Sequence, residues 1–531
     1  MKGIYKKLPF ILEKVLEKKY RIEISPPLWE MPSQDKFGDI STTVALKVSS
    51  LIKKNPLEIA KEIKKKLEKY LKKEVEKIEI IPPGFVNLFI SKKCLINYLN
   101  QILRYKEKFF QTKIKRKVLV EFVSANPTGP LSIAHGRQAV VGDVIASVLN
   151  FFGNRIAREY YINDVGRQID LLVNSVKARL EELRGKETIF PQDGYQGEYV
   201  KEVARKYLEE KTSVDLKEFS IRYLLSLIKK DLDVLGVKFD SWVSQNKLIQ
   251  KKKVDKAIED LEKRGFIYEK DGALWFSSTK FGDDKDRVVL KNDQEYTYFA
   301  SDIAYHRDKI ERGFDLLINL WGPDHHGYIE RIKASLKAQK FKDDILKIII
   351  IQLVKIKSKE KMSKRRGNIV LLSQLLELIG KEAARFYYLI RRNSSHLDFD
   401  IELATTSSFE NPLYYIQYAC ARIESIFRKS KLKKISPSFS RFLKEEEEFL
   451  LLRKILQFFY CLQKVYYSLE PVFIIEYLKD LAFYFHKFYE RKRVLEEKKQ
   501  IMCARLNLLE ATKVVLHCGL KLLGIEPKTS M

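Results

Sequence analysis

Two stretches of this sequence carry residues whose types and spacing suit a nucleotide. Residues 124–136 read SANPTGPLSIAHG, and they join an apolar, β-branched run at 118–123 to a helical pattern that begins near His135. A helix that starts there presents free N–H groups and a positive dipole end to a phosphate. Far downstream, Lys361 and Lys364 stand three apart in KMSK. A lysine loop of this kind can move cations onto a polyphosphate as negative charge develops on it.

Two acids in apolar surroundings indicate a cationic ligand. Glu121 is the single acid in VLVEFV, and Asp302 follows Tyr298 by four residues, so the latter two side chains share one face of a predicted helix. A buried guanidinium needs such carboxylates, because an uncompensated buried cation is costly. The alternatives are that Glu121 is an edge-strand acid facing water, and that Tyr298 and Asp302 form an exposed helix pair.

Other common nucleotide and metal motifs are missing. The sequence has neither a G-x-x-x-x-G-K-[ST] loop nor a G-x-G-x-x-G, so ATP is not expected to bind as in P-loop or dinucleotide enzymes. His325 and His326 are adjacent, but on a turn they point apart and no third ligand is spaced nearby, so we predict no metal site. Asp324 and His325 are interpreted as nucleotide or substrate contacts, with a core histidine as the alternative.

The elements that must position these residues form a strand–helix–strand unit. The helix that contains His135 is expected to end at Gly153, and a strand at 156–162 follows. Such crossovers are right-handed, and ligands bind at the carboxyl ends of the strands. The same fold resumes with a helix at 296–305, strands at 316–321 and 345–357, the loop with KMSK, and helices at 371–379 and 382–390.

The remaining patterns predict a multidomain α/β protein. Residues 1–110 indicate an N-terminal α+β module, 111–400 a Rossmann-like domain with an insertion at about 171–285, and 401–531 an all-α helix bundle. The module is expected to contain helices at 4–19 and 57–70 and strands at 75–81 and 85–90. The insertion is expected to contain helices at 171–184, 199–211 and 216–235 and a hairpin region at 272–290.

Composition narrows the partners and the compartment. The 531 residues carry 99 Lys and Arg against 70 Asp and Glu, a formal net charge of +29, which favours nucleic acid ahead of an anionic membrane as a partner. A general lysine bias is the alternative. The five cysteines form no C-x-x-C, so we expect reduced thiols in a cytoplasmic protein. No apolar run is long enough to predict a membrane span.

Taken together, these stretches resemble the class I aminoacyl-tRNA synthetases, and the arginyl-tRNA synthetase family in particular. In that family SANPTGPL leads into a His-x-Gly-His signature. Here SANPTGPL is intact at 124–131, whereas the signature reads Ser132-Ile133-Ala134-His135, so its first histidine and its glycine are replaced. The KMSK loop follows in the order that class I enzymes have, and the resemblance covers nearly the whole chain.

The resemblance implies a role for each set of residues. Ser132, His135, Lys361 and Lys364 are the catalytic candidates around the α-phosphate and the pyrophosphate. The candidates for ATP binding are Pro127, Gly129, His135, Gly136, Asp324, His325, Met362 and Ser363, and those for arginine binding are Glu121, Ser124, Asn126, Tyr298, Asp302 and His325. Phe85 and Asn87 are candidates to touch the tRNA D-loop and Met531 is a further tRNA contact; the alternative is a core phenylalanine and an exposed strand asparagine.

The implied activity is that of an arginine–tRNA ligase. L-arginine, ATP with Mg²⁺, and tRNA(Arg) are the expected ligands of a monomeric cytoplasmic enzyme, and the tRNA is expected to be needed for the activation step. One rival is a tRNA-binding paralogue with impaired catalysis, which Ser132 and Ala134 favour. A second rival is a synthetase for another amino acid, but a neutral amino acid would leave Glu121 and Asp302 without a partner.

Overall fold

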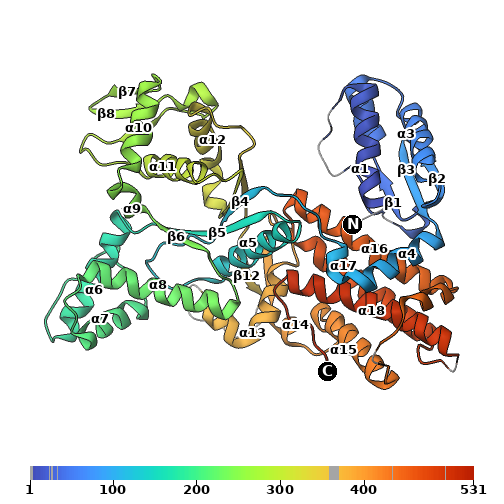
Figure 1. The fold of residues 1–531 in the computed structure, drawn as a ribbon. Helices are drawn as coiled ribbons and strands as arrows, with labels where there is room; N and C mark the ends of the chain where they lie inside the picture. Colours follow the sequence, from blue (N-terminus) through green and yellow to red (C-terminus); the bar gives the residue numbers. More distant parts are fainter. Residues whose placement is uncertain are drawn as a thin grey trace. The chain divides into compact units, whose positions relative to one another are not determined.

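The computed structural model describes residues 4–22, 24, 28–32, 34–357, 370–432, 434–496 and 498–531. The chain divides into two compact units, one of Met1–Lys113 with Leu403–Met531 and one of Ile114–Glu402 (Figure 1). The KMSK loop, residues 361–364, lies outside the described residues. Within the described ranges, no helix combines the length and the hydropathy that a bilayer crossing requires.

The N-terminal part of the first unit is built on a three-stranded antiparallel sheet. Its strand order is β1 (Ile40–Thr42), β3 (Phe85–Ile90), β2 (Val75–Ile81), and its helices are α1 (Ile4–Val15), α2 (Val44–Ile52), α3 (Pro56–Leu71) and α4 (Lys92–Tyr105). Helix α3 begins at the N-cap Asn55, whose side chain accepts a hydrogen bond from the Leu57 N–H. The predicted strands are confirmed, whereas β1, α2 and α4 were not predicted.

The C-terminal part of the same unit is a helix bundle, as predicted. It contains α15 (Pro412–Ser430), α16 (Glu446–Ser468), α17 (Val472–Arg491) and α18 (Lys499–Leu522), with the short helix α14 (Ile401–Thr405) before them. Each long helix buries a continuous apolar face, and α16 and α18 also pack against α4. The buried ion pair between Arg505 and Glu448, at 2.8 Å, ties α18 to the first turn of α16.

The second unit is organised around a five-stranded parallel sheet. The strand order is β11 (Leu346–Ile350), β10 (Leu316–Trp321), β4 (Lys117–Glu121), β5 (Arg155–Ile162), β6 (Ser241–Ser244). From β4 the chain first adds strands on one side and later adds β10 and β11 on the other. The direction of strand addition therefore reverses between β4 and β10, and in such sheets the crevice outside the carboxyl ends at the reversal binds ligands.

Helices cover this sheet and extend from it. They are α5 (Ile133–Phe151), α6 (Arg167–Leu183), α7 (Glu198–Glu210), α8 (Leu216–Leu235), α9 (Gln245–Gln250), α10 (Lys253–Lys263), α11 (Tyr298–Glu311), α12 (Ile329–Ala338) and α13 (Leu372–Tyr388). A small antiparallel sheet of β7 (Ile267–Lys270), β8 (Ala273–Phe276) and β9 (Arg287–Leu290) includes the predicted hairpin region. Strand β6 lies within the span expected to be inserted, yet it pairs with β5 in the main sheet.

One predicted strand differs from the structure, and two predicted helices are confirmed. The single strand predicted at 345–357 is wrong: β11 belongs to the main sheet, while β12 (Val354–Lys357) pairs with β13 (Leu397–Asp400) in a separate sheet. An apolar run of this length does not reveal where one strand leaves a sheet and another begins. The two helices predicted at 371–390 follow one another as α13, which is interrupted by non-helical geometry at Gly380.

Helix α5 lies close to β4 because Gly142 has no side chain. A Cβ atom at Gly142 would overlap the ring of Phe122, which is itself fully buried. At its far end α5 stops where predicted, with Gly153 at a φ of 95°. The close approach fixes the height of the α5 N-terminus, and with it His135, above the carboxyl end of β4.

We predict that Gly142→Ala destabilises the protein although alanine is the better helix former. In an open helix this change gains about 1 kcal/mol, but here the methyl group must displace Phe122, which costs about 1–3 kcal/mol. Urea denaturation followed by tryptophan fluorescence measures the difference. Gly327→Ala is the matched control, because a Cβ at Gly327 meets nothing within 4 Å; equal midpoints for the two variants would contradict the prediction.

Candidate active site

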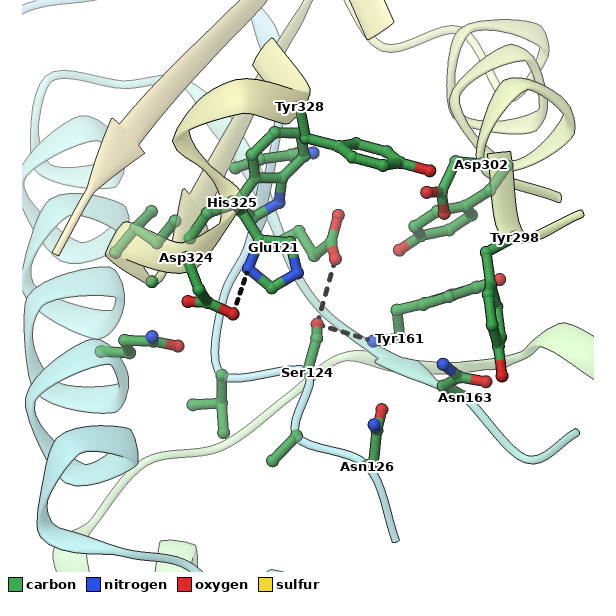
Figure 2. A pocket seen from close by; sticks show the side chains of 18 of the residues that line it. Glu121, Ser124, Asn126, Tyr161, Asn163, Tyr298, Asp302, Asp324, His325 and Tyr328 are labelled. Carbon is green, nitrogen blue, oxygen red and sulfur yellow. Dashed lines mark hydrogen bonds and ion pairs between the residues drawn. The ribbon is translucent and has the colours of Figure 1, made fainter. Parts of the chain in front are cut away.

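A sharp turn follows β4 and brings three residues of the SANPTGPL stretch into a cavity. Val123 and Ser124 have positive φ values of 66° and 40°, a strained conformation for a β-branched residue. The turn points Ser124 back towards the strand (Figure 2). Its hydroxyl donates to Glu121 Oε1 at 3.0 Å and accepts from the Tyr161 N–H at 3.1 Å. The strained turn thereby links β4 to β5 at the level of Glu121.

The cavity, of about 600 Å³, lies at the carboxyl ends of β4, β5 and β10, where the order of strand addition reverses. The predicted site residues that line it are Glu121, Ser124, Asn126, His135, Tyr298, Asp302, Asp324 and His325. Pro127, Gly129, Ser132 and Gly136 do not line it. Lys361, Met362, Ser363 and Lys364 lie outside the described residues. The structure thus brings together the predicted arginine-binding set and part of the predicted ATP-binding set.

Helix α11 covers a row of polar residues that crosses the sheet. Glu121 is in register with Asn319 on β10 and with Glu159 on β5, so their side chains share one face. Lys309 of α11 is fully buried, and its Nζ lies 2.5 Å from Glu121 Oε2 and 3.2 Å from Asn319 Oδ1. The alternative that Glu121 is an edge-strand acid facing water is wrong, because β4 is the central strand and Glu121 is 6% exposed.

The neighbouring acid of the row, Glu159, has its own set of partners. Arg312 donates to both of its carboxylate oxygens at 2.6 and 2.8 Å, and the Tyr305 and Ser241 hydroxyls donate to them at 2.8 and 2.7 Å. Burial alone would raise the pKa of Glu159, but Arg312 and the charge of Lys309 outweigh burial and lower that pKa. Glu159 is therefore ionised, and its carboxylate is already satisfied by Arg312 and the two hydroxyl groups, so it is not available to a ligand.

His306 completes the contact between α11 and the row, as a neutral imidazole. Burial and the nearby Lys309 lower the pKa of His306 to about 3. Its Nδ1 lies 2.8 Å from the Asp302 carbonyl oxygen, which can only accept, so Nδ1 carries the proton. Its Nε2 then accepts from the Asn319 side-chain amide at 2.9 Å. The chain of hydrogen bonds from Asp302 through His306 and Asn319 to Lys309 fixes the rotation of α11.

Asp302 differs from Glu121 and Glu159 because no cation stands within ion-pair distance of it among the described residues. Burial raises the pKa of Asp302 to about 7, and the charge of Glu121 adds to the rise, while a hydrogen bond from Tyr328 and the charge of Lys309 oppose it. Figure 2 shows Asp302 and Tyr328 turned towards one another across the cavity. A cationic ligand is the missing partner that this arrangement favours.

Three further polar atoms on the cavity wall have no hydrogen-bond partner within the described part of the chain. They are Tyr161 OH, Asn163 Oδ1 and Gln245 Oε1, all buried. Buried polar atoms are normally paired, so unpaired ones on a cavity wall indicate a polar ligand. Asn163 follows the last residue of β5 and lines the cavity, whereas its neighbour Asp164 accepts from the Ser244 hydroxyl and from the Asn246 N–H at the start of α9.

The α5 N-terminus presents His135 to the cavity in one defined tautomer. The Ser132 N–H donates to His135 Nδ1 at 3.1 Å, and Ser132 Oγ lies 3.2 Å from the same nitrogen. Since Nδ1 accepts, Nε2 carries the proton and is free to donate. Burial lowers the pKa of His135, with the charge of Asp324 opposing it, so the ring is neutral near pH 7. Ser132 therefore orients His135 and does not itself face the cavity.

The residues beyond the KMSK loop join this helix start. Val370 accepts a hydrogen bond from the Ile133 N–H at 3.1 Å, and the Leu372 N–H donates to the Leu131 carbonyl at 2.8 Å. On the other side of α5, Gly136 packs against α13, where a Cβ would lie 2.6 Å from the Tyr388 hydroxyl. Any side chain at position 136 would therefore collide with α13, which explains why this residue is glycine.

The SANPTGPL turn is also supported by helices that follow β5. Tyr199 of α7 donates its hydroxyl to the Thr128 carbonyl at 2.8 Å, and its ring lies against Gly129. Asn126 donates its side-chain amide to Gln168 of α6. The part of the chain expected to be an insertion therefore supports the site although it has no signature of its own.

At the far end of the cavity, the strand-to-helix turn after β10 carries Asp324 and His325. This turn is a 3-10 helix, η5 (Pro323–Tyr328), and Asp324 Oδ2 lies 3.0 Å from His325 Nδ1. Both side chains are more than half exposed, which excludes the alternative of a core histidine at 325. Among the residues that the structure describes, no three His, Cys, Asp or Glu side chains gather as a metal site would require.

Comparisons with known proteins identify the family. Residues 98–396 match the family described as tRNA synthetases class I (R), catalytic domain; residues 6–90 match the arginyl tRNA synthetase N terminal domain, and residues 416–531 the DALR anticodon binding domain. An arginine–tRNA ligase of Carboxydothermus hydrogenoformans is 41% identical over 523 residues, which cover 94% of each chain. The chain belongs to the arginyl-tRNA synthetases.

Solved structures of similar proteins agree with the fold. A putative arginyl-tRNA synthetase of Campylobacter jejuni is 34% identical with a TM-score of 0.77, and the match covers 83% of this chain and all of that one. The arginyl-tRNA synthetase of Thermus thermophilus has a TM-score of 0.81 over the whole of both chains at 20% identity, which is a likeness of fold. The class I catalytic fold and the C-terminal helical domain predicted from the sequence are confirmed.

The tRNA-contact candidates of this synthetase lie in the first unit. Asn87 is 3% exposed, and its Oδ1 accepts from the Ser41 hydroxyl at 2.6 Å, so the alternative that it is an exposed strand residue is wrong. Phe85, the first residue of β3, is partly exposed and is the more accessible of the two. Met531 is half exposed, at 50%.

Sequence reasoning missed several residues of the synthetase site. Lys309, Asn319, His306, Tyr161, Gln245 and Tyr328 were not predicted. A signal for Lys309 existed, because it stands seven residues after Asp302 and so shares its helix face, and because a buried Glu121 demands a cation. In a chain with 99 Lys and Arg, one more lysine on a helix looks like an ordinary surface residue.

We predict that binding of a guanidinium ligand to this cavity strengthens as pH rises through about 7. Asp302 is neutral below its pKa and anionic above it, so affinity for a cation such as arginine should fall about tenfold per pH unit below that value. Calorimetric titration with arginine across this range measures it. Asp302→Asn should bind weakly at every pH; a pH-independent affinity in the unmodified protein would contradict the role of Asp302.

Proposed function

We propose that the chain activates L-arginine with ATP and transfers it to the 3′ end of tRNA(Arg), as an arginine–tRNA ligase. The observation that carries the proposal is the cavity at the α11 end, where Asp302 lines the ligand space with no ion-pair partner in the described part of the chain and Glu121 lines it too. An arginine side chain supplies a permanent charge and a planar fork of donors that two carboxylates can accept. A neutral amino acid would leave Asp302 unpaired.

The rest of the arginine fits along the turn after β4. Tyr298 also lines the cavity, is 48% exposed, and stands one helix turn before Asp302 on α11. Ser124 and Asn126 are placed to meet the α-amino and carboxylate groups, and Asn163 Oδ1 offers an unpaired acceptor on the same wall. In this orientation the carboxylate points away from the acids and towards His135.

ATP occupies the α5 end in this proposal. His135 Nε2–H and the N-terminus of α5 donate to its phosphates, with Asp324 and His325 on the adenosine side and Pro127, Gly129 and Gly136 shaping the neighbouring backbone. Lys361 and Lys364, with Met362 and Ser363 between them, act on the polyphosphate. The pairing of Val370 with Ile133 supports this assignment, because it joins the chain just beyond that loop to the helix start.

Mg²⁺ fits this end of the cavity as a companion of the nucleotide. The ion keeps water and phosphate ligands and needs at most one or two carboxylates, and Asp324 offers an exposed one. When bound, the ion would neutralise phosphate charge. The chain's own contribution is to hold ATP and arginine in line and to place donors where charge develops.

The reaction proceeds in two steps. The arginine carboxylate oxygen attacks the α-phosphorus of ATP, the bond to the bridging oxygen breaks, and pyrophosphate leaves. A ribose hydroxyl of the tRNA 3′ end then attacks the arginyl carbonyl, forming an ester and releasing AMP. Neither step demands a strong base from the protein, because positioning and charge stabilisation supply most of the acceleration.

The tRNA is assigned to the flanking domains. We assign residues 1–110, with Phe85, to the tRNA elbow and residues 401–531, with Met531, to the anticodon, around a catalytic domain of residues 111–400. The net charge of +29 supports a polyanionic partner. We further propose that the enzyme acts as a monomer in the cytoplasm, in keeping with its five free, buried cysteines.

The paralogue with impaired catalysis is less well supported. Ser132 and Ala134 depart from the family signature, but the backbone N–H that fixes the tautomer of His135 is present at position 132 whatever its side chain, and the Ser132 hydroxyl lies 3.2 Å from the same ring nitrogen. The two acids of the pocket also remain in place. Ala134 is partly exposed in the first turn of α5 and leaves the helix geometry intact.

Pyrophosphate exchange tests the function. We expect exchange with arginine and tRNA(Arg) and little exchange when the tRNA is left out. Binding of tRNA without exchange would support the impaired paralogue, and exchange with a different amino acid would support a synthetase of other specificity. Asp293→Asn, an exposed acid outside the cavity, is the control variant and should exchange as the unmodified enzyme does.

A second prediction concerns the tautomer of His135. His135→Gln keeps an N–H donor at similar reach, whereas His135→Leu removes it while keeping the volume. We expect the leucine variant to lose about 10- to 100-fold in the exchange rate, the loss of one hydrogen bond to a charged group, and the glutamine variant to lose less. Equal losses in the two variants would mean that Nε2–H does not donate to ATP.

A further inference from the structure

We propose that Lys309 is a positioning residue that sets the specificity of the arginine pocket, by neutralising Glu121 so that only one carboxylate is left in need of a cation. This inference rests on the proposed function, because it concerns how the same pocket selects a substrate with a single positive charge. Lys309 does not line the cavity. It therefore acts through Glu121 and not by touching arginine.

The position of Lys309 is fixed on every side. Its side chain is 0% exposed, and its Nζ contacts Glu121 Oε2 and Asn319 Oδ1 and lies 4.0 Å from the centre of the Tyr305 ring. Two acceptors and an aromatic face satisfy a buried ammonium group. An ion held in this way cannot swing towards the ligand, so its charge is a permanent part of the pocket wall.

Glu121 is held by both of its oxygens. Oε2 faces Lys309, and Oε1 accepts the Ser124 hydroxyl at 3.0 Å. It can still accept hydrogen bonds from a guanidinium group, but its charge is already balanced. Asp302, seven residues before Lys309 on α11, forms no ion pair with any residue that the structure describes, and the charges of Lys309 and Arg331 act on it only from a distance. Of the two acids at this end of the cavity, one is neutralised by the protein and one is left for the substrate, which matches the single charge of arginine.

A second ion pair, between Arg312 and Glu159, lies next to the pocket but does not contribute to its wall. This pair joins α11 to the sheet one strand further along and one helix turn later, with Glu159 buried and Arg312 one-third exposed. Neither residue lines the cavity. A change at Arg312 thus breaks an ion pair of a buried carboxylate between α11 and the sheet without altering the charge of the cavity wall, so Arg312→Met is the control for Lys309→Met.

Removing Lys309 has a consequence that structural damage would not produce. The groups that act on Asp302 are Glu121 of β4, Tyr161 of β5, Lys309 of α11, Tyr328 of η5 and Arg331 of α12. Lys309 lowers the pKa of Asp302, so its loss raises that pKa further. Asp302 would then keep its proton to a higher pH beside the charge of Glu121, and arginine would have to displace that proton.

The experiment is a double-mutant cycle on arginine KM, measured by pyrophosphate exchange with saturating ATP and tRNA over a range of pH. Lys309→Met should raise the KM for arginine about tenfold or more near pH 7 and move the inflection of its pH profile up by about one unit, with the KM for ATP unchanged. Glu121→Gln should also raise the KM, because it leaves Lys309 as an unbalanced cation. The double variant removes both charges and should bind arginine better than either single variant.

The control and the contrary results are distinct. Arg312→Met should lower the melting temperature and leave the inflection where it is in the unmodified enzyme. A Lys309→Met profile with an unmoved inflection, or a double variant no better than Glu121→Gln, would overturn the role of Lys309. If Lys309→Met alone does not fold, the comparison of the double variant with Glu121→Gln still decides. Absence of arginine-dependent exchange in the unmodified enzyme would overturn the proposed function itself.

Discussion

The ion pair between Glu121 and Lys309 is the constraint from which the architecture of the catalytic unit follows. A carboxylate in the middle of a parallel sheet needs a partner, since an uncompensated buried charge costs about 3–5 kcal/mol. Helix α11 supplies it, and in doing so it turns its polar side, with Asp302, His306 and Lys309, towards the sheet. The arginine pocket is formed between this polar helix face and the strand ends.

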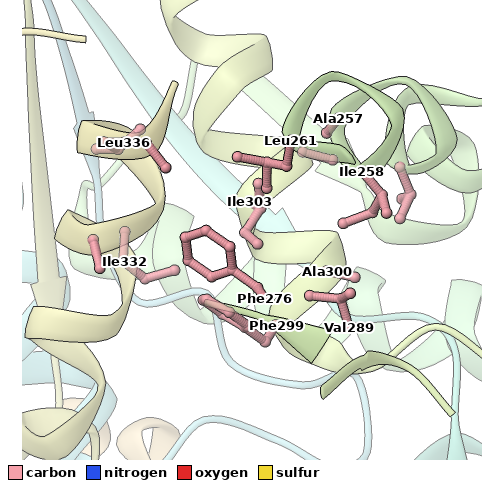
Figure 3. Close-up of a cluster of buried hydrophobic side chains, with 14 of the residues drawn as sticks. Ala257, Ile258, Leu261, Phe276, Val289, Phe299, Ala300, Ile303, Ile332 and Leu336 are labelled. Carbon is pink, nitrogen blue, oxygen red and sulfur yellow. The ribbon is translucent and has the colours of Figure 1, made fainter. Parts of the chain in front are cut away.

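A helix that faces the sheet with its polar side must bury its apolar side elsewhere. Phe299, Ala300, Ile303 and Ala304 belong to a core that α10, β8 and α12 complete together with Leu119 and Leu317 of the main sheet. Figure 3 shows Phe299, Ala300 and Ile303 beside Phe276 of β8 and the side chains of α10. Phe276 of β8 and Ile258 and Leu261 of α10 belong to the same cluster. The segment between β6 and α11 therefore has a structural role. It provides the apolar surface that packs against α11 and keeps the polar side of that helix turned towards Glu121 and Asn319.

The sequence predicted the catalytic fold because its signals are local. The β-branched runs, the SANPTGPL turn and Gly153 each mark an element by their own residue types, and the resulting strand–helix–strand unit placed Glu121 and His135 at one edge. Other features depend on pairings that local patterns do not contain. Strand β6 is four residues long and joins the sheet from inside a helical region, and the run at 345–357 divides between two sheets.

Part of the candidate site could be predicted from local sequence patterns, and part could not. Residues in unusual local surroundings, such as Glu121 among valines, could be found, whereas Lys309 and Asn319 acquire meaning only once α11 is laid over the sheet. Lys309 could not be distinguished from the many surface lysines of this chain. Asn319 is the single polar residue in LLINLW, which is only a weak signal. The strained turn at Val123 and Ser124 was likewise visible as turn chemistry but not as the connection between β4 and β5.

The central claim, that Asp302 meets the guanidinium as the one unbalanced acid of the pocket, is tested most directly by counting protons. Calorimetry of arginine binding in buffers of different ionisation enthalpy gives the number of protons released. Since the pKa of Asp302 is raised to about 7, close to one proton should leave per arginine bound at about pH 6, and the number should fall towards zero at about pH 8. Binding at the lower pH without proton release would contradict the account.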